Sequence, residues 1–401
     1  MRKGYMDWPA HRRERRDWNP RHRQGSRADR ALEHIEVTLP PFIGTLTYEP
    51  SGVVARAHEA AIIAVARLEA GYGDHLAPLA DFLLRSESVA SSKIEHIDAG
   101  WHAFGRAFGG GKASNEAKSQ IAAVTALVAM VDAAGTGIIT LDNLLGAHRL
   151  LMAPDYYAAR DSGTIRDVQN WIGGSDYTPI DALYVPPPPD LVPELMDDLI
   201  VFANRTDLPI LAQAALAHAQ FESIHPFVDG NGSIGRAFVS AILRRRGLTR
   251  RITVPLASAM LADTSRYFGK LGAYRNGRAD EFVEYVATAT IHTSEAAQDS
   301  ARALAELPDH WRRTVKPRTN SADEALLAHL LDTPILNADT AQQITGTTDV
   351  NAYRALNRLT DAGILEVLSE SKRNRIWAAT DVFAELDALS AATGKRTTDH
   401  L

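Results

Sequence analysis

Apolar residues recur every three or four positions over about 52–160, and this period predicts a mainly helical region. The run from 60 to 68 is typical, with alanine, isoleucine, valine and leucine on one helical face. Two further helices are predicted over about 210–223 and 233–246, on either side of a short glycine-rich loop. Helical sequence then continues to about 307. The pattern therefore predicts a mainly α fold.

Residues 163–187 break this pattern. Glycines and prolines divide them into short apolar segments, which predicts a β-hairpin or an extended loop. The proline run 186–189 should be stiff polyproline II. Asp190 is then expected to cap a helix that continues to about Asn204.

The C-terminal part has a different organisation. Pro308 and Pro317 bracket an expected polar linker. Beyond it, helices are predicted at 323–332, 338–345, 349–362 and 381–391, with a strand, a turn and a strand over 364–379. Three helices followed by a two-stranded wing indicate a winged helix-turn-helix.

These boundaries give five expected parts: a basic arm at 1–36, a helical region at 37–135, a helical core at 136–307, a linker at 308–320 and a winged helix at 321–395. The arm carries ten Lys or Arg and four Asp or Glu over residues 1–30, so it is expected to be disordered.

Composition narrows the class of protein. The chain has 401 residues, of which 45% are hydrophobic, and it contains no cysteine, so disulfides and thiolate metal sites are excluded. No run reads as a membrane span or a secretory signal, so a cytoplasmic protein without a membrane partner is expected. The net charge of −6 provides no overall attraction to nucleic acid.

The segment 221–236 carries the most chemical information. Gly230 and Gly232 leave backbone N–H groups uncovered just before a helix, whose N-terminus favours an anion such as a phosphate. Asp229 offers oxygen ligands for Mg²⁺, and Arg236 can reach a terminal phosphate. His225 is mostly neutral at pH 7 and can accept a proton. Each residue alone would fit an ordinary turn, but together they indicate nucleotidyl transfer.

This segment also resembles a known signature. The order His-Pro-Phe-x-Asp-Gly-Asn-Gly at 225–232, with Arg236 four residues later, is similar to that of the Fic family. The segments 39–42, 163–166, 171–173 and 184–189 resemble neighbouring family regions, so the similarity extends over roughly 37–300.

The resemblance implies an all-helical Fido core with a β-hairpin flap, ATP as substrate and Mg²⁺ as cofactor. His225 would deprotonate a Ser, Thr or Tyr hydroxyl of a target protein, which would attack the α-phosphorus, while Asp229 held the metal. The target would dock on the flap at 163–187. Gly232 stands where the phosphorylating branch carries lysine, which favours AMP transfer. The expected phosphate-binding residues are Gly230, Asn231, Gly232, Ser233, Ile234, Gly235 and Arg236.

Two features modify this expectation. Ser233 replaces the first arginine of the signature, so one phosphate contact is lost and efficient catalysis is in doubt. Ser91 and Glu95 match the family's inhibitory element, with His96 in place of its small last residue. Glu95 is expected to pair with Arg236 and to occupy the γ-phosphate position.

Other residues receive weaker assignments from the sequence. Tyr267 and Tyr274 are the candidates for the adenine slot, by resemblance. His148 and His218 lie in apolar helical contexts, which indicates structural roles. Basic residues of the winged helix could contact DNA; these are Arg354, Arg358, Lys372, Arg373 and Arg375.

Several alternatives stay open at this level. The chain could also remove AMP, or transfer another nucleotide such as UMP. It could instead be an ATP-responsive transcriptional regulator with a weak or inactive Fido domain. Similar proteins commonly form homodimers, but no residue here demonstrates one.

Overall fold

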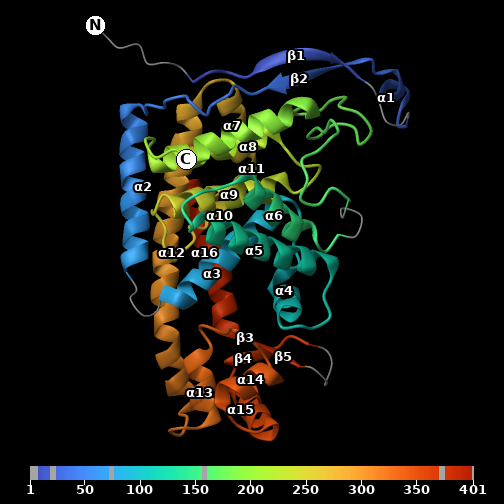
Figure 1. The fold of residues 1–401 in the computed structure, drawn as a ribbon. Helices are drawn as coiled ribbons and strands as arrows, with labels where there is room; N and C mark the ends of the chain where they lie inside the picture. Colours follow the sequence, from blue (N-terminus) through green and yellow to red (C-terminus); the bar gives the residue numbers. More distant parts are fainter. Residues whose placement is uncertain (1–7, 19–23, 72–75, 156–159, 370–374, 400–401) are drawn as a thin grey trace. The chain divides into compact units, whose positions relative to one another are not determined.

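The computed structural model describes residues 8–18, 24–71, 76–155, 160–369 and 375–399. Helices predominate in it, as the sequence predicts (Figure 1). The chain divides into two compact units, each assembled from three segments. The first comprises Met1–Ile62, Ala126–Leu248 and Ser265–Thr288, and the second comprises Ile63–Thr125, Thr249–Thr264 and Ala289–Leu401. Three helices contribute to both units: α2 (Gly52–Ala70), α5 (Asn115–Ala134) and α12 (Ala279–Val315).

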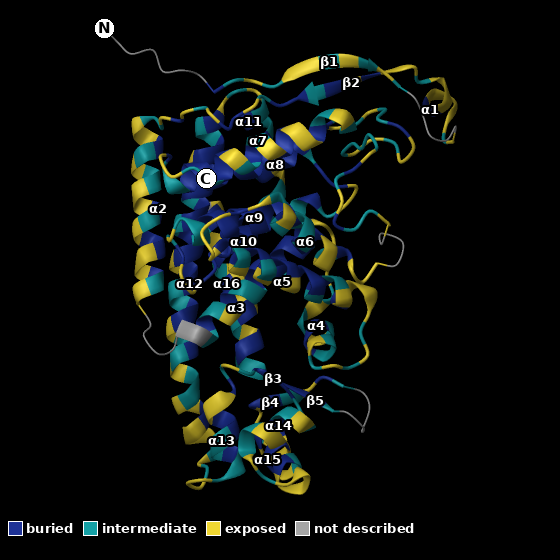
Figure 2. Cartoon of the chain, in the orientation of Figure 1, coloured by how far each residue is buried: buried dark blue, intermediate teal, exposed yellow. Residues whose placement is uncertain are grey.

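The first unit is organised around helix α8 (Ile210–Ile224). Every residue from 211 to 224 is buried, because other helices cover this helix on all sides (Figure 2). Its neighbours include α7 and α9. The remaining elements of this unit are β1 (Arg12–Asp17), α1 (Arg27–Ala31), β2 (His34–Leu39), α6 (Leu141–Met152), α7 (Val192–Ala203), α9 (Asn231–Arg245) and α11 (Thr264–Arg275).

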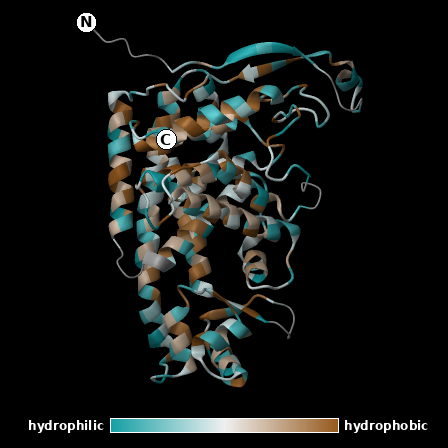
Figure 3. Ribbon diagram, in the orientation of Figure 1, coloured by the Kyte–Doolittle hydropathy of each residue, from teal (hydrophilic) through white to brown (hydrophobic). Residues whose placement is uncertain are grey.

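The N-terminal arm is folded in the described residues, so the prediction of a disordered arm is wrong there. Strand β1 pairs with β2 in an antiparallel register that sets Arg12 opposite Leu39. Strand β1 is hydrophilic (Figure 3), whereas alternate residues of β2 pack into a small apolar cluster. Trp8 is only 7% exposed, and its ring contacts the rings of Tyr48, Phe202 and Tyr274. Burial of this aromatic surface, which a charge count does not detect, anchors the arm.

Two other local predictions need correction in this unit. The 163–187 hairpin is reduced to a single antiparallel bridge between Ile172 and Tyr184. Asp190 lies inside a short 3-10 turn, Pro189–Leu191, and α7 begins at Val192 without a side-chain cap. Pro189 at the first position starts the turn early, because its ring fixes φ and removes an N–H donor.

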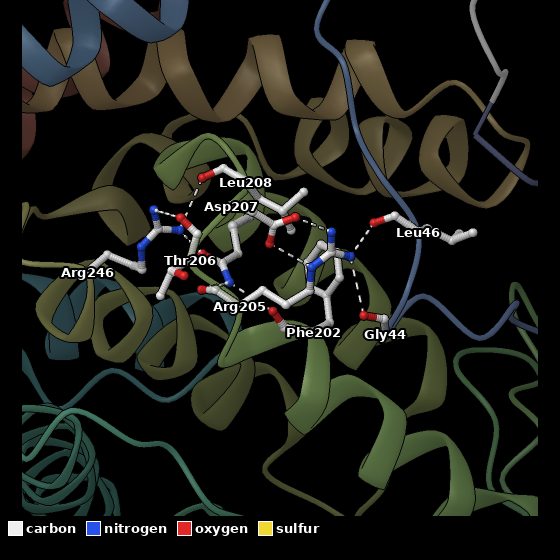
Figure 4. A network of polar contacts seen from close by, with 9 residues as sticks. Gly44, Leu46, Phe202, Arg205, Thr206, Asp207, Leu208 and Arg246 are labelled. Atoms are coloured by element: carbon white, nitrogen blue, oxygen red, sulfur yellow. Dashed lines mark hydrogen bonds and ion pairs between the residues drawn. The ribbon is translucent and has the colours of Figure 1, made fainter.

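Arginine side chains form hydrogen bonds in the loop between α7 and α8 (Figure 4). Arg205 pairs with Asp207 at 2.7 Å and donates to the carbonyls of Gly44 and Leu46. Arg246 donates to the carbonyls of Thr206 and Leu208, each at 3.1 Å. These carbonyls lie outside the helices and so have no helical N–H partner. The arginines supply their hydrogen bonds and thereby fix the start of α8.

The second unit contains the C-terminal elements. Its strands form a sheet in the order β3-β5-β4, with both pairs antiparallel. The winged-helix assignment stays a prediction. Strand β3 was not predicted from the sequence. The elements of this unit are α3 (Leu76–Ile94), α4 (Gly100–Phe108), α10 (Leu256–Ala262), α13 (Ala322–His329), β3 (Ile335–Asn337), α14 (Ala338–Thr345), α15 (Asp349–Asp361), β4 (Leu365–Val367), β5 (Ile376–Ala379) and α16 (Thr380–Asp399).

The expected linker at 308–320 is partly wrong, because α12 continues through Pro308 to Val315. Trp311 explains the continuation. Its ring is fully buried, and its Nε1 donates to Asp381 at 2.7 Å. Burying an indole with a satisfied N–H outweighs the roughly 3 kcal/mol that an interior proline costs a helix.

Helix α5 is long and apolar enough to cross a membrane by length and composition, although no membrane span was expected from the sequence. Half of its apolar window is buried inside the structure. A core helix passes the same test, so this feature is weak evidence for a membrane.

The packing of Trp8 gives a test of the folded arm. Replacing Trp8 by alanine should lower the free energy of unfolding by about 3–5 kcal/mol, because it removes a buried indole. Denaturant titration followed by circular dichroism measures this change. Arg12→Ala, on the exposed strand, is the matched control and should change stability by less than about 0.5 kcal/mol. Equal effects of the two substitutions would mean that the arm is not docked.

Candidate functional site

His225 lies at the point where α8 ends. It takes a left-handed conformation, φ 51° and ψ 62°, and its N–H donates to the Phe221 carbonyl at 2.8 Å. This conformation costs a non-glycine residue about 1–2 kcal/mol, so the surrounding contacts must hold it in place. The turn directs the chain out of α8 and into the loop at 226–230.

Arg166 supplies those contacts. Its guanidinium donates to the carbonyls of His225 at 2.8 Å, of Pro187 at 2.6 Å and of Val168 at 2.8 Å. Its own N–H donates to the Pro226 carbonyl at 2.9 Å. The side chain is only 3% exposed. Five N–H donors in a rigid plane match several carbonyls at once, so Arg166 fixes the His225 turn against the 163–187 segment.

Two amide groups fix the imidazole of His225. Asn170 Nδ2 lies 2.9 Å from His225 Nδ1, and Asn231 Nδ2 lies 3.2 Å from the same atom. The Asn231 amide is oriented by Phe227, whose N–H donates to Asn231 Oδ1 at 2.8 Å. Amide nitrogens only donate, so Nδ1 acts as the acceptor and the ring hydrogen belongs on Nε2.

The imidazole is neutral over the physiological range. Burial, together with the guanidinium charges of Arg166 and Arg275, lowers the pKa of His225 to about 3. Arg275 is held nearby, with its guanidinium 3.5 Å from the Tyr184 ring centre. A neutral imidazole can accept a proton at pH 7.

Helix α9 begins directly after the loop. Gly230 is its N-cap with φ 75°, and a Cβ there would lie 2.9 Å from Leu151 and 3.3 Å from the Met152 sulfur. Only glycine fits both constraints. The N–H groups of residues 231–233 have no intrahelical acceptor in this position, and the helix N-terminus favours an anion. Gly230, Asn231, Gly232 and Ser233 therefore lie where the sequence predicted a phosphate cradle.

His148 holds the loop from α6. Its ring stacks on Phe227, with centroids 3.8 Å apart. Its Nε2 lies 3.1 Å from the Asp229 carbonyl, and its Nδ1 accepts the N–H of Gly163 at 2.9 Å. His148 is therefore structural, in agreement with the prediction, and it connects the loop to the 163–187 segment.

Two other predicted phosphate ligands, Ile234 and Gly235, serve packing. Ile234 is fully buried, and its N–H donates to the Gly230 carbonyl at 3.2 Å, so it offers no free donor. A Cβ on Gly235 would lie 2.5 Å from Glu222 Oε1, so this glycine lets α9 approach α8. Arg236 is buried at 2% exposure in the first turns of α9.

The structure does not support the adenine assignments. Tyr267 and Tyr274 are fully buried, so neither ring has a face that a nucleotide could contact in this conformation. The hydroxyl of Tyr274 donates to Gln220 at 2.7 Å, and that of Tyr267 lies 2.8 Å from His218 Nε2. The neighbouring Phe268 is 53% exposed and is an aromatic that the sequence did not single out.

The inhibitory candidates lie in the second unit. Ser91 is buried in the last turn of α3, and Glu95 follows the end of this helix. The Ile97 N–H donates to the Ser92 carbonyl at 3.0 Å and the His96 N–H to the Lys93 carbonyl at 3.0 Å, which is a Schellman motif. His96 has φ 60°, a conformation that favours the glycine or asparagine of the family element. Arg236 belongs to the first unit, so its pairing with Glu95 stays a prediction.

The side chains around Asp229 bear on the expected magnesium site. Within the described ranges, three or more His, Cys, Asp or Glu residues nowhere gather into a metal-binding group. Asp229 is exposed, and its Oδ1 accepts the Gly230 N–H at 2.7 Å. One carboxylate fits Mg²⁺ that is bound mainly through nucleotide phosphates.

One basic residue of the predicted winged helix forms an ion pair within the protein. Arg358 forms a bidentate pair with Asp323, at 2.8–3.1 Å, so it is not available to a DNA phosphate. Lys372 and Arg373 lie outside the described residues. Arg354 is exposed and Arg375 is half-buried.

The geometry defines a helical domain in which a histidine loop leads into a helix N-terminus with uncovered N–H groups, an arrangement that favours an anion. Comparison with known proteins agrees with this class. Residues 138–243 match the Fic/DOC family. A probable protein adenylyltransferase of Aquifex aeolicus is 39% identical over 75 residues, which are 18% of this chain and 23% of that protein. The protein adenylyltransferase Fic of Nematostella vectensis is 29% identical over 160 residues, which are 39% of this chain and 34% of that protein.

A solved Fic family protein from Desulfovibrio desulfuricans has the same fold, with a TM-score of 0.54 and 22% identity. The alignment covers 83% of this chain and 98% of that structure. The chain spans about a third or less of the length of the two curated relatives above. The chain thus contains a Fic/DOC domain at 138–243, and the predicted mainly α Fic fold is confirmed.

Three histidines with lowered pKa values predict a pH-dependent stability. The pKa values of His11, His218 and His225 are all lowered to about 3, with burial as the largest cause. The unfolded chain therefore binds more protons below pH 6.5, so their contribution is complete above pH 6.5 and is lost as the pH falls toward 3.

For a fully buried histidine this loss is about 1.4 kcal/mol per pH unit within the window. Urea titrations at pH 6.5 and pH 5 should show a loss that is about 2 kcal/mol smaller in His218→Gln than in wild type. Glutamine keeps a partner for the Tyr267 hydroxyl but does not titrate. Identical losses would mean that His218 is protonated in the folded protein.

Proposed function

We propose that this protein transfers AMP from ATP to a hydroxyl of a target protein. The observation that carries the proposal is that His225 lies beside the N-terminus of α9. His225 Nδ1 is 3.2 Å from Nδ2 of Asn231, the first residue of this helix. A proton acceptor therefore lies beside the backbone N–H groups that suit a phosphate chain. Curated relatives named protein adenylyltransferase support the same reaction class.

In this reaction the target oxygen forms a bond to the α-phosphorus of ATP. The bond between that phosphorus and the oxygen that bridges it to the β-phosphorus breaks. His225 takes the hydroxyl proton, and pyrophosphate leaves. The first-turn N–H groups of α9 stabilise charge on the phosphates. Asp229 would hold Mg²⁺, which neutralises phosphate charge when it is bound.

The base function requires an unprotonated ring nitrogen that faces the target. In the arrangement described above the hydrogen is on Nε2. The Asn170 Oδ1 is buried without a hydrogen-bond partner among the described residues. For base function the hydrogen would have to move to Nδ1, and the Asn170 and Asn231 amide nitrogens that now face this atom would have to move away, which would leave Nε2 as the basic atom.

The 163–187 segment is proposed to dock the target, and Glu95 to hold the enzyme in check. The Schellman motif fixes Glu95 at the C-terminal end of α3, where the helix dipole disfavours a carboxylate by about 0.3–1 kcal/mol. A cation that pairs with Glu95 would remove this penalty, and the buried Arg236 is the proposed partner. Glu95 would then compete with the γ-phosphate for that guanidinium.

Release of this brake should be measurable. Glu95→Gly is expected to raise self-modification with labelled ATP by at least about tenfold, because a carboxylate–arginine pair of a few kcal/mol is lost. The double variant Glu95→Gly with His225→Ala should show no transfer. If Glu95→Gly and wild type incorporate label equally, Glu95 is no brake. If transfer persists without His225, this histidine is not the base.

Ser233 gives a second test of the phosphate cradle. It lies half-buried in the first turn of α9, where an arginine could reach the phosphates. In the Glu95→Gly background, Ser233→Arg should raise the rate by about tenfold to a hundredfold, which corresponds to one added charge-assisted hydrogen bond. Ser233→Gln, of similar length without charge, should stay within about twofold. Equal rates for the arginine and glutamine variants would place phosphates elsewhere.

The alternative is an ATP-responsive regulator that acts on DNA through the predicted winged helix. The observation that favours it is Ser233, which weakens catalysis but not ATP binding. The Arg358–Asp323 pair counts against it, because it removes one of the basic side chains that DNA binding would use. Removal of AMP, transfer of UMP and a homodimer stay open beside the main proposal.

A further inference from the structure

The last turn of helix α8, which leads into His225, receives hydrogen bonds from side chains outside the helix. The last four carbonyls of an α-helix have no N–H partner within it. The guanidinium of Arg275 donates through Nη2 to the Glu222 carbonyl at 3.2 Å. The hydroxyl of Tyr184 donates to the next carbonyl, that of Ser223, at 2.7 Å. The backbone that carries His225 is therefore held from outside the helix by these two residues.

Arg275 and Tyr184 also contact each other. The guanidinium lies 3.5 Å from the centre of the Tyr184 ring, which is within the range of a cation–π contact. Nε of Arg275 donates to the Ser223 hydroxyl at 3.3 Å, and that hydroxyl donates in turn to the Ala219 carbonyl at 2.7 Å. One planar cation thus joins the Tyr184 ring to the last turn of α8. Lysine could not do this, because an ammonium group has no plane that can stack on a ring while its edge donates hydrogen bonds.

The N-terminal arm holds the backbone of Arg275 in place. The His11 N–H donates to the Arg275 carbonyl at 2.9 Å, and the His11 ring meets the Tyr274 ring edge-on, with centroids 5.5 Å apart. Gly277 has φ 82°, and a Cβ there would lie 2.7 Å from the Trp8 carbonyl, so the arm and the turn after α11 are in close contact. The position of Arg275 is therefore set before any ligand binds, as is required of a residue that orients a catalytic group.

We propose that Arg275 is a positioning residue of the transfer reaction, which places the His225 ring through the last turn of α8 and through Tyr184. This rests on the proposed function, and it adds a residue from α11 to the groups that orient the histidine. The competing role is a direct contact between Arg275 and a phosphate of ATP. The two roles change different quantities. Loss of a positioning residue lowers the rate at saturating ATP, whereas loss of a phosphate ligand also weakens ATP binding.

Three substitutions in the Glu95→Gly background separate these roles. Arg275→Met removes the charge and the contacts of the guanidinium, whereas Arg275→Lys keeps a positive charge. Arg278→Met is the matched control, because Arg278 follows closely in the chain, is exposed and pairs with Glu281 at 2.7 Å. Circular dichroism checks that each variant is folded, and Arg275→Lys carries both tests if Arg275→Met is not.

The first measurement is the rate of AMP transfer as a function of ATP concentration. At saturating ATP, Arg275→Met and Arg275→Lys should each lower the rate by about tenfold or more, because a small misplacement of the base is costly. The ATP concentration that gives half the maximal rate should stay within about threefold of the parent value. Arg278→Met should leave both quantities within about twofold.

The second measurement needs no AMP transfer. In protein labelled with ¹⁵N-histidine, long-range ¹H–¹⁵N spectra report which ring nitrogen carries the hydrogen, and a His225→Gln chain identifies the His225 signals. In wild type one tautomer is expected, with the hydrogen on Nε2, because two amide nitrogens face Nδ1. Both Arg275 variants should shift these signals toward the average of the two tautomers, since the ring loses its fixed place, and Arg278→Met should not.

These measurements can overturn the proposal in three ways. If Arg275→Lys keeps the parent rate, the charge alone is sufficient. If Arg275→Met raises the ATP concentration for half the maximal rate by about tenfold, Arg275 contacts the nucleotide. If the His225 signals of both Arg275 variants match wild type, Arg275 does not place the ring. Signals that change as expected, in a protein whose Glu95→Gly chain transfers no AMP, would leave the placement of the ring standing and reject the proposed function.

Discussion

The site depends on one set of contacts, the hydrogen bonds from the buried Arg166 guanidinium to backbone carbonyls around His225. A left-handed turn at a non-glycine residue is strained, and it persists only where neighbouring groups compensate. Arg166 does so because one rigid cation can satisfy carbonyls that come from three parts of the chain. Without it, three or more buried carbonyls would lack partners, and the orientation of His225 would no longer be fixed.

The same cation also sets the chemistry of the histidine. The half-buried imidazole of His225 stays neutral, because desolvation disfavours its charged form and protonation would add a third positive charge beside two guanidinium groups. The N-terminus of α9 adds its own partial positive charge to this environment. The arrangement therefore combines an electropositive environment, which suits a phosphate chain, with an imidazole that this environment keeps unprotonated. Both properties follow from the placement of Arg166 and Arg275.

Helices α8 and α3 each end at a left-handed residue, but the two residues have different roles. At His225 the turn is held by tertiary contacts and presents a side chain. At His96 a Schellman motif ends α3 and leaves Glu95 at the negative end of the helix dipole. The family's glycine or asparagine at this place has a physical reason, since such residues adopt this conformation more readily. Histidine here keeps the backbone geometry at some cost in stability.

The sequence by itself determined the helical class, the loop from His225 to Gly230 and the start of α9, because these depend on residues close together in the chain. Local periodicity and glycine positions are sufficient for such elements. Tertiary structure alone decided that Arg166, Asn170 and Tyr184, each about 40–60 residues before the loop, converge on it. It also decided that the charged arm folds through Trp8, that α12 passes Pro308, and that Tyr267 and Tyr274 are core residues. In each case burial of a distant partner outweighs the local signal, and no pattern of neighbouring residues reports which distant partner will be buried.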